Sequence, residues 1–138
     1  MEYKIWVYVL CFNEIRLVPF VIDYWKQYAS HVVVYDNGST DGTLEELSKY
    51  PDFIEIRHFD TNNTFDDKTH MRLKNSIWKE TKDKGIDFVQ VSDFDEVLIS
   101  KNFNKSLKLL KESGRPIWAS KCFEIYSKVF PEYNGGIL

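Results

Sequence analysis

Three short polar clusters hold the side chains that could do chemistry, and each follows an apolar run. The longest is "DNGSTDGT" (Asp36–Thr43), which combines two carboxylates, an amide and three hydroxyls directly after "HVVVY". "DFDE" (Asp93–Glu96) follows "FVQVS", and "FNE" (Phe12–Glu14) follows "VYVLC". A surface turn needs only part of this polar content, so the clusters predict a binding site.

The acidic cluster indicates a divalent metal. Asp93 and Asp95 point to the same side of an extended segment, because side chains alternate with a period of two. Two carboxylates held close together repel each other unless a cation lies between them. Magnesium and manganese take such oxygen ligands and share their remaining positions with phosphate. A solvated acidic loop is the alternative, and the motif alone does not exclude it.

The longest cluster has simpler interpretations, which explain only part of it. Asn37–Gly38 supports a turn, and Ser39, Thr40 or Asp41 can cap a following helix. A calcium loop starting at Asn37 would place Ser48 where a bidentate glutamate is required. A phosphate loop and a dinucleotide fingerprint are excluded, since their glycine spacings are missing.

A diphosphate ligand would need cations in addition to the metal. The segment "KTHMRLKNSIWK" supplies several, and Arg72 and Lys74 are the residues that we expect to reach a phosphate. The histidines show no pattern of a Ser–His–Asp arrangement.

Apolar runs alternate with helical stripes along the chain. The runs predict strands at Tyr3–Cys11, Val32–Tyr35, Phe53–His58, Asp87–Ser92 and Ile117–Phe123. Helices are predicted around Val21–Tyr28, with Pro19 in the first turn, and at Thr43–Tyr50, Phe65–Lys84 and Asn104–Ser113.

This alternation predicts an α/β fold in which a mostly parallel, twisted sheet lies between helices, as one domain over residues 1–138. Ligands of such sheets bind beyond the carboxyl ends of the strands. All three polar clusters fall at those ends, and their convergence is stronger evidence than any one cluster.

Bulk properties exclude some classes of protein. The net charge of −3 argues against a general nucleic-acid binder. Cys11 and Cys122 fit no metal-ligand spacing or disulfide framework, which favours a reducing, cytoplasmic setting. The apolar start has the features of a buried strand rather than of a signal peptide.

Taken together, "NE", "YDNGSTDGT" and "DFDE" resemble the nucleotide-sugar half of a family 2 glycosyltransferase with the GT-A fold. The segment from "KNSIWK" to "VQVSDFDE" is similar to a bacterial branch of that family that acts in surface polysaccharide synthesis. The resemblance spans roughly Lys4 to Ile99 and keeps the motifs in order.

The resemblance implies a role for each matching position. Phe12, Asn13 and Glu14 would line the base and ribose pocket, and Asp36 would accept a hydrogen bond from the base. The rest of the nucleotide-sugar-binding set would be Asn37, Ser39, Asp41, Arg72, Lys74 and Asp93. Asp93 and Asp95 match the family's Asp-any-Asp signature, which implies a bound Mn²⁺ or Mg²⁺.

The resemblance also implies a function. The chain would transfer a sugar from a nucleoside diphosphate sugar, with uridine as the expected base, to a saccharide or lipid-linked acceptor in polysaccharide or lipopolysaccharide synthesis. It would work in the cytoplasm or peripherally at the inner membrane face.

The catalytic base remains unassigned, because the family carries it downstream of the metal motif and only about forty residues follow here. The chain therefore looks truncated, and uncovered apolar surface would favour a homo-oligomer.

Three alternative functions stay open, and the sequence favours them to different degrees. A non-catalytic nucleotide-sugar-binding module, or a fragment without the base, would keep the same pocket. A nucleotidyltransferase would want a glycine-rich loop where "LCFNEIRLVP" has no glycine. A two-component receiver would need more acids after the first strand than Glu14 supplies.

Overall fold

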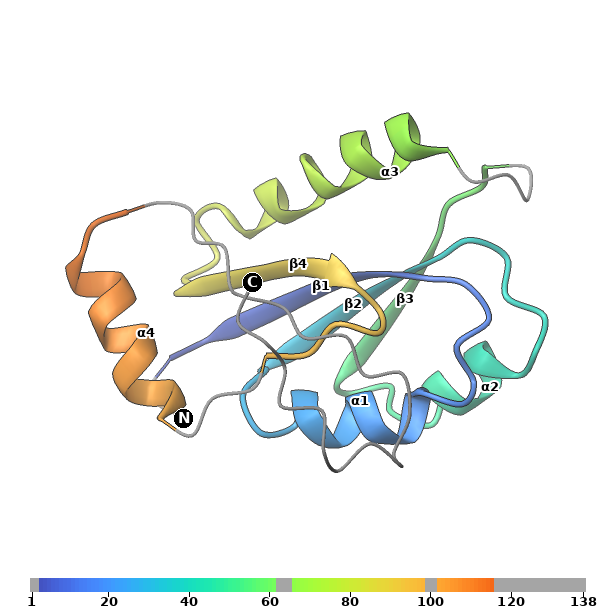
Figure 1. Cartoon of the computed structure of the whole chain (residues 1–138), viewed down its shortest axis with the longest axis horizontal. Coiled ribbons are helices and arrows are strands. Elements are labelled where there is room, and N and C mark those ends of the chain that lie inside the picture. Colours follow the sequence, from blue (N-terminus) through green and yellow to red (C-terminus); the bar gives the residue numbers. More distant parts are fainter. Residues whose placement is uncertain (1–2, 62–65, 99–101, 116–138) are drawn as a thin grey trace, which may run out of the picture. The chain divides into compact units, whose positions relative to one another are not determined.

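The structure is a computed structural model that describes residues 3–61, 66–98 and 102–115. A parallel sheet forms its centre (Figure 1). The strands are β1 (Ile5–Cys11), β2 (His31–Asp36), β3 (Ile54–His58) and β4 (Phe88–Asp93), in the order β3-β2-β1-β4. The strand predictions for these segments are confirmed to within two residues at each end. The predicted strand Ile117–Phe123 lies outside the described residues.

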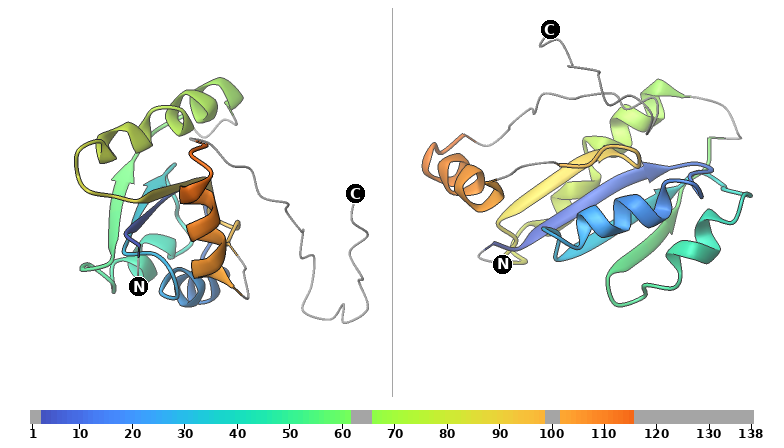
Figure 2. Two further views of the ribbon diagram at one scale, coloured as in Figure 1. Left: turned by 90° about the vertical axis from the view of Figure 1, so that its left-hand side faces the viewer. Right: turned by 60° about the horizontal axis from the view of Figure 1, so that its bottom comes forward.

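Helices cover both faces of the sheet. The helices α1 (Val18–Trp25) and α2 (Thr43–Leu47) lie on one face, in front of the sheet in the right-hand view of Figure 2. The helix α3 (Asp67–Lys74) and the 3₁₀ helix η1 (Ile77–Thr81) lie on the other face (Figure 1). This is a Rossmann-like α/β arrangement, and it confirms the predicted α/β class and the parallel sheet.

The two central strands are apolar because both of their faces are covered. In β1, Val7, Tyr8 and Val9 are all completely buried, and so are Val33 and Val34 of β2. A strand buried on both faces needs a continuous apolar run rather than an alternating one. Each such side chain contributes roughly 1.5–3 kcal/mol through burial, so these strands anchor the fold that positions the polar edge.

The segment of α3 and η1 is held to the sheet by apolar packing and by hydrogen bonds. Ile77 and Leu73 pack with Tyr8 of the sheet. The Tyr8 hydroxyl donates to Glu80 Oε1 at 2.7 Å, and Arg57 Nη1 donates to the same oxygen at 2.8 Å. These contacts hold the segment after α3 against the sheet.

The predicted helix Phe65–Lys84 is wrong as one continuous element. Helix α3 ends at Lys74, and η1 follows with tighter turns. The Ser76 hydroxyl donates to the Leu73 carbonyl at 3.0 Å, and the Thr81 hydroxyl donates to the Trp78 carbonyl at 2.6 Å. Only the Ser76 bond lies at the interruption, and a hydroxyl that bonds a nearby carbonyl competes with regular helical bonding and so favours a break there.

The chain divides into two compact units, Met1–Phe103 and Asn104–Leu138. Helix α4 (Phe103–Glu112) belongs to the second unit apart from its first residue, and it matches the predicted helix Asn104–Ser113. Among the described residues, no helix combines the length and the apolar character needed to cross a membrane.

Candidate functional site at the carboxyl edge of the sheet

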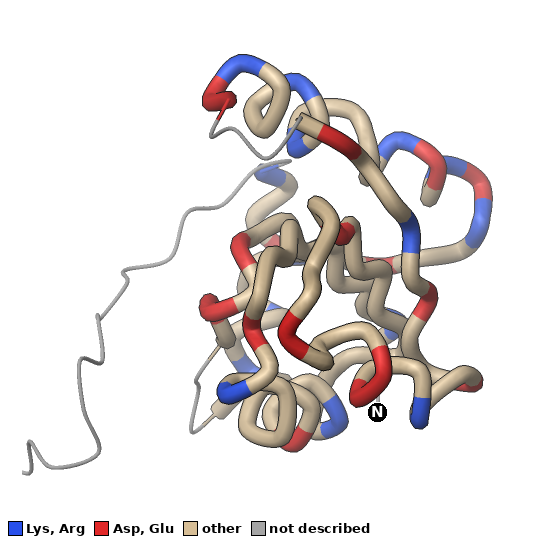
Figure 3. Tube along the Cα trace, turned by 90° about the vertical axis from the view of Figure 1, so that its right-hand side faces the viewer, with Lys and Arg blue, Asp and Glu red and all other residues tan. Residues whose placement is uncertain are grey.

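The strand register brings the polar clusters to one edge. Cys11 at the end of β1 pairs with Asp36 at the end of β2, and Leu10 pairs with Asp93 at the end of β4. The chain adds β2 and β3 on one side of β1 and then crosses to β4 on the other, so strand order reverses beside β1. Such a reversal is where open α/β sheets bind ligands. Figure 3 views this end of the molecule and shows several acidic positions on it.

Asp36 organises the turn that follows β2. Its side chain is completely buried, and its Oδ2 accepts hydrogen bonds from the backbone N–H groups of Gly38 and Ser39 at 2.9 and 3.0 Å. Its Oδ1 accepts the Ser39 hydroxyl. Gly38 has a φ of 83°, a conformation that glycine adopts without steric cost. The carboxylate therefore fixes the shape of this turn, whatever further partner it has in a complex.

Ser39 and Asn13 connect the loops after β1 and β2. The Asn13 N–H donates to Ser39 Oγ at 2.8 Å, and Asn13 Oδ1 accepts the Thr40 N–H at 2.8 Å. Asn13 has a φ of 56°, in the left-handed region that asparagine tolerates better than most residues. Asn13 and Ser39, which the sequence predicts as ligand-binding residues, thus connect two loops by hydrogen bonds.

Asp41 and Thr43 form a second connection between the same loops. Asp41 Oδ1 accepts from the Thr43 N–H and hydroxyl, and Asp41 Oδ2 accepts the Ile15 N–H at 3.1 Å. The Thr43 hydroxyl oxygen also accepts the Glu14 N–H at 2.9 Å. Desolvation opposes ionisation of Asp41, but the bonds from Thr43 and Ile15 outweigh it and lower the pKa of the carboxyl.

Much of the polar content of "DNGSTDGT" is therefore explained by bonds within and between loops. Asn37 also belongs to this pattern, since its Nδ2 donates to Thr61 Oγ1 at 2.8 Å and its Oδ1 accepts the Thr61 N–H. Phe12 differs, because 47% of its side chain is exposed at the end of β1. An exposed aromatic ring beside these hydrogen-bonded loops is a suitable surface for stacking a planar base.

The acidic cluster forms a tight turn with its carboxylates on the outside. Phe94 is buried and meets Trp25 edge to face with ring centroids 5.2 Å apart, and its N–H donates to the Leu10 carbonyl. Glu96 folds back, so that its Oε2 accepts the Asp93 N–H at 3.0 Å. Of the two aspartates on either side of Phe94, Asp93 is half-buried and Asp95 is exposed.

Lys74 reaches this turn from the end of α3. Its Nζ lies 2.7 Å from Asp93 Oδ1, and the two side chains are 31% and 50% exposed. We expect Lys74 and Asp93 to serve the same ligand, and the structure places them in direct contact. The ammonium group of Lys74 thus neutralises the carboxylate of Asp93.

Glu14 and Asp95 create unbalanced negative charge at the same edge. Burial raises the pKa of the Glu14 carboxyl above its usual range, and the carboxylates of Asp95 and Asp41 raise it further. A cation bound near Asp95 would relieve this repulsion.

The donor chemistry fits a hard divalent metal that is only partly held by protein. Asp93 and Asp95 offer oxygen ligands at an exposed turn. Over residues 3–61, 66–98 and 102–115, no three His, Cys, Asp or Glu side chains come together as a ligand cluster. Magnesium and manganese commonly bind through one or two carboxylates and take the other oxygens from phosphate and water.

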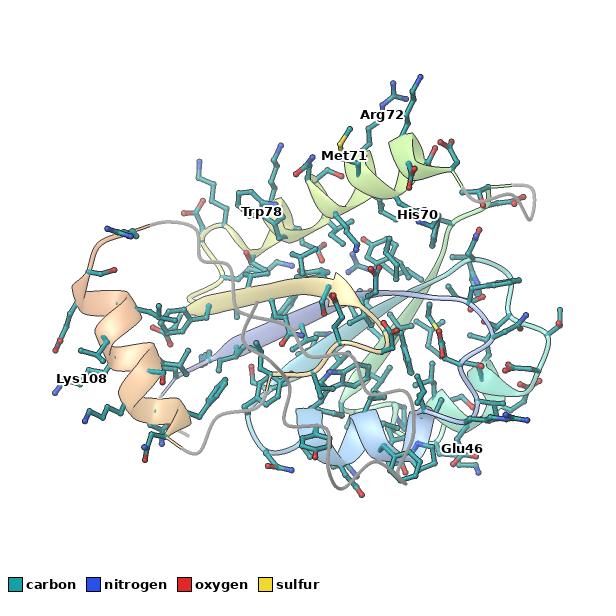
Figure 4. The ribbon with its side chains drawn as sticks, in the orientation of Figure 1. Glu46, His70, Met71, Arg72, Trp78 and Lys108 are labelled. Carbon is teal, nitrogen blue, oxygen red and sulfur yellow. The ribbon has the colours of Figure 1, made fainter. Side chains whose placement is uncertain are left out.

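Arg72 is the predicted site residue that does not join the others. It is exposed on α3, and Figure 4 shows its side chain pointing away from the sheet, with that of Met71 beside it. Lys74 lies two residues further on and is turned toward the sheet edge, as its contact with Asp93 shows.

Two residues near the site escaped the sequence reasoning. His58 Nδ1 lies 3.8 Å from Asp36 Oδ2, although most of the imidazole is exposed. The parallel register of β2 and β3 pairs Asp36 with His58, and the two predicted strands, Val32–Tyr35 and Phe53–His58, do not by themselves set that register. The sequence counts Thr43 among the hydroxyls of the polar cluster and at the start of a helix, but it does not show that this hydroxyl links two loops.

Cys11 lies just inside the same edge. Burial raises the pKa of its thiol, and the carboxylates of Asp36 and Glu14 raise it further, so it behaves as a buried apolar residue as predicted. Cys122 lies outside the described residues.

Comparisons of the chain with protein-family models, with curated proteins and with solved structures found no match.

Proposed function

We propose that this chain is the nucleotide-sugar-binding part of a metal-dependent glycosyltransferase of the GT-A type, similar to family 2 enzymes. The observation that carries the proposal is the convergence of Asp36, Asp93 and Lys74 at one carboxyl edge, beside the reversal of strand order. The proposed donor is a nucleoside diphosphate sugar with uridine as the base, and the acceptor is a saccharide or a lipid-linked sugar.

Different residues would bind different parts of the nucleoside diphosphate sugar. Phe12 would stack on the base, and Asp36 and its turn would shape the base pocket. Asp93 and Asp95 would hold Mn²⁺ or Mg²⁺, which when bound neutralises charge on the departing diphosphate. Lys74 would add a second positive charge to the diphosphate once it leaves Asp93.

A non-catalytic nucleotide-sugar-binding module is the second candidate. A specific observation favours it: the carboxylate of Glu96, which follows Asp95 in the sequence, accepts the Asp93 N–H and is thus part of the turn itself. This candidate shares the donor site and differs only in lacking transfer to an acceptor.

The donor site can be tested by calorimetric titration of UDP, with and without Mn²⁺, into the parent and Asp95→Asn proteins. The proposal expects binding that needs the metal and that the substitution weakens by at least tenfold, equivalent to about 1.4 kcal/mol. Glu112→Gln, which removes an exposed carboxylate of α4, is the matched control and should bind as the parent does. Absence of binding to a folded parent protein would refute the donor site.

An assay of sugar transfer distinguishes the enzyme from the non-catalytic binding module. If UDP-sugars bind but neither hydrolysis nor transfer to saccharide acceptors is detected, the binding module is supported. Release of UDP from a UDP-sugar that depends on Asp95 would support the enzyme. The proposed location is cytoplasmic, because nucleotide sugars would have to be available to this site.

A further inference from the structure

We propose that the outer face of α3 and η1 binds the surface of a bilayer rich in anionic lipids. This face, called the basic stripe below, consists of exposed residues of α3, of η1 and of the turns that follow each of them. Its members are Lys68, Met71, Arg72, Asn75, Trp78, Lys79 and Lys82. The stripe is separate from the carboxyl edge, and the proposal does not depend on the proposed function.

The packing of the segment turns this face outward. Leu73 and Ile77 pack against the sheet, which leaves the opposite side of the segment to solvent. Figure 4 shows Met71, Arg72 and Trp78 directed away from the sheet. Met71 is 59% exposed and Trp78 is 42% exposed, so two large apolar side chains lie among the cations of the stripe.

The charge of the stripe is opposite to that of the chain. The stripe carries four cations and no acid, while the whole chain has a net charge of −3, so the remaining residues carry a net charge of −7. The exposed acids Asp67 and Asp83 bound the stripe at its two ends. None of the four cations pairs with a carboxylate in the part of the chain that the structure describes.

An anionic lipid surface fits this combination of cations and exposed apolar side chains better than other polyanions do. Interfacial helices combine cations with tryptophan, because the indole ring sits at the headgroup level while lysine and arginine meet anionic headgroups. Cations near such a surface contribute about 1 kcal/mol each. The acidic remainder of the chain repels any polyanion alike, so it is the exposed apolar side chains of Met71 and Trp78 that favour a lipid surface over a nucleic acid.

Flotation with vesicles tests the proposal directly. We expect the full chain to bind phosphatidylglycerol-rich vesicles and not phosphatidylcholine vesicles, with binding that declines as salt is added. The double variant Arg72→Gln/Lys79→Gln should bind about 30-fold more weakly, from the loss of two interfacial cations. Trp78→Ser should weaken binding several-fold without changing net charge.

Matched controls separate the stripe from net charge and from general hydrophobicity. Lys26→Gln/Lys49→Gln removes two exposed cations from the α1 and α2 side and makes the same change in net charge. Tyr24→Ser removes an exposed aromatic ring of α1, which is 39% exposed. Both controls should bind vesicles as the parent does.

Several results would overturn the proposal that the stripe binds anionic lipid. Equal losses in the stripe and control variants, or equal binding to neutral and anionic vesicles, would contradict it. Tighter binding to RNA or to polyglutamate than to anionic vesicles at the same salt concentration would also contradict it, and would assign the stripe to a different partner. Circular dichroism of each variant shows that a loss of binding is not a loss of fold.

Discussion

Replacing Lys74 by methionine should change metal binding and nucleotide binding in opposite directions. A metal that binds Asp93 must first displace the Lys74 ammonium group, which lies 2.7 Å from Oδ1. The two side chains are 31% and 50% exposed, and pairs this accessible contribute about 0.2–1 kcal/mol. Removing the competitor should therefore tighten Mn²⁺ binding in the absence of nucleotide by roughly 1.4- to 5-fold.

The same substitution removes a cation that the diphosphate would use. A hydrogen bond to a charged group contributes about 1.5 kcal/mol at the lower end of its range, so UDP binding at saturating Mn²⁺ should weaken by about tenfold. A simple loss of structure would weaken both affinities together. A tighter Mn²⁺ affinity together with a weaker UDP affinity is thus specific to a lysine that alternates between Asp93 and a phosphate.

Mn²⁺ affinity can be measured by electron paramagnetic resonance of the free ion, and UDP affinity by calorimetry. Lys79→Met is the matched control, since Lys79 is an exposed lysine of the same segment that the structure does not pair with Asp93. Unchanged or weaker Mn²⁺ binding in Lys74→Met, or the same change in the control, would refute the reasoning.

Three further predictions concern stability and metal dependence. Thr43→Val keeps the shape of the buried side chain but removes the hydroxyl that links two loops, and should lower the free energy of unfolding in urea by about 1–3 kcal/mol. A hydrogen bond from Arg57 lowers the pKa of Glu55, so this pair stabilises the fold above the unfolded-state pKa of glutamate and loses its effect as pH falls through the lowered folded-state value. Glu55→Gln should therefore melt at a lower temperature than the parent at neutral pH, and the two melting curves should converge in acid. Adding EDTA to the UDP complex should abolish UDP binding, and excess Mg²⁺ should restore it; binding that survives chelation would contradict a role for the metal.

The parallel sheet could be predicted from sequence because its strands have an unambiguous signal. "VYVLC" and "HVVVY" are continuous apolar runs, and such runs form strands covered on both faces. Polar clusters directly after them then had to lie at one edge, and the register of Cys11 with Asp36 and Leu10 with Asp93 agrees.

The helix Phe65–Lys84 shows where periodicity misleads. Its apolar spacing continues through Asn75 and Ser76, but a single Ser76 hydroxyl bonding the Leu73 carbonyl favours a break. Met71 and Trp78, which fit the same helical spacing, are exposed rather than packed. Periodicity identifies which residues share a face, but it does not say whether anything covers that face.

The roles of the loop residues depended on partners far away in sequence. Ser39 and Asn13 are 26 residues apart, and nothing in either motif shows that they bond to each other. The sequence predicted a ligand for these polar groups, whereas the structure shows that they bond to each other first. The same limit applies to Lys74 and Arg72, since only the register of α3 against the sheet decides which one reaches Asp93.

The most direct test of the donor site is to map where UDP binds. Two-dimensional ¹H–¹⁵N spectra of the labelled chain, recorded with Mg²⁺ and increasing UDP, report each backbone N–H. We predict shifts confined to Lys74 and to the loops at Phe12–Ile15, Asp36–Asp41 and Asp93–Glu96, with no change at Ser30 or His31, at the opposite end of the sheet. Shifts that avoid the carboxyl edge, or a spectrum that UDP leaves unchanged, would contradict the account.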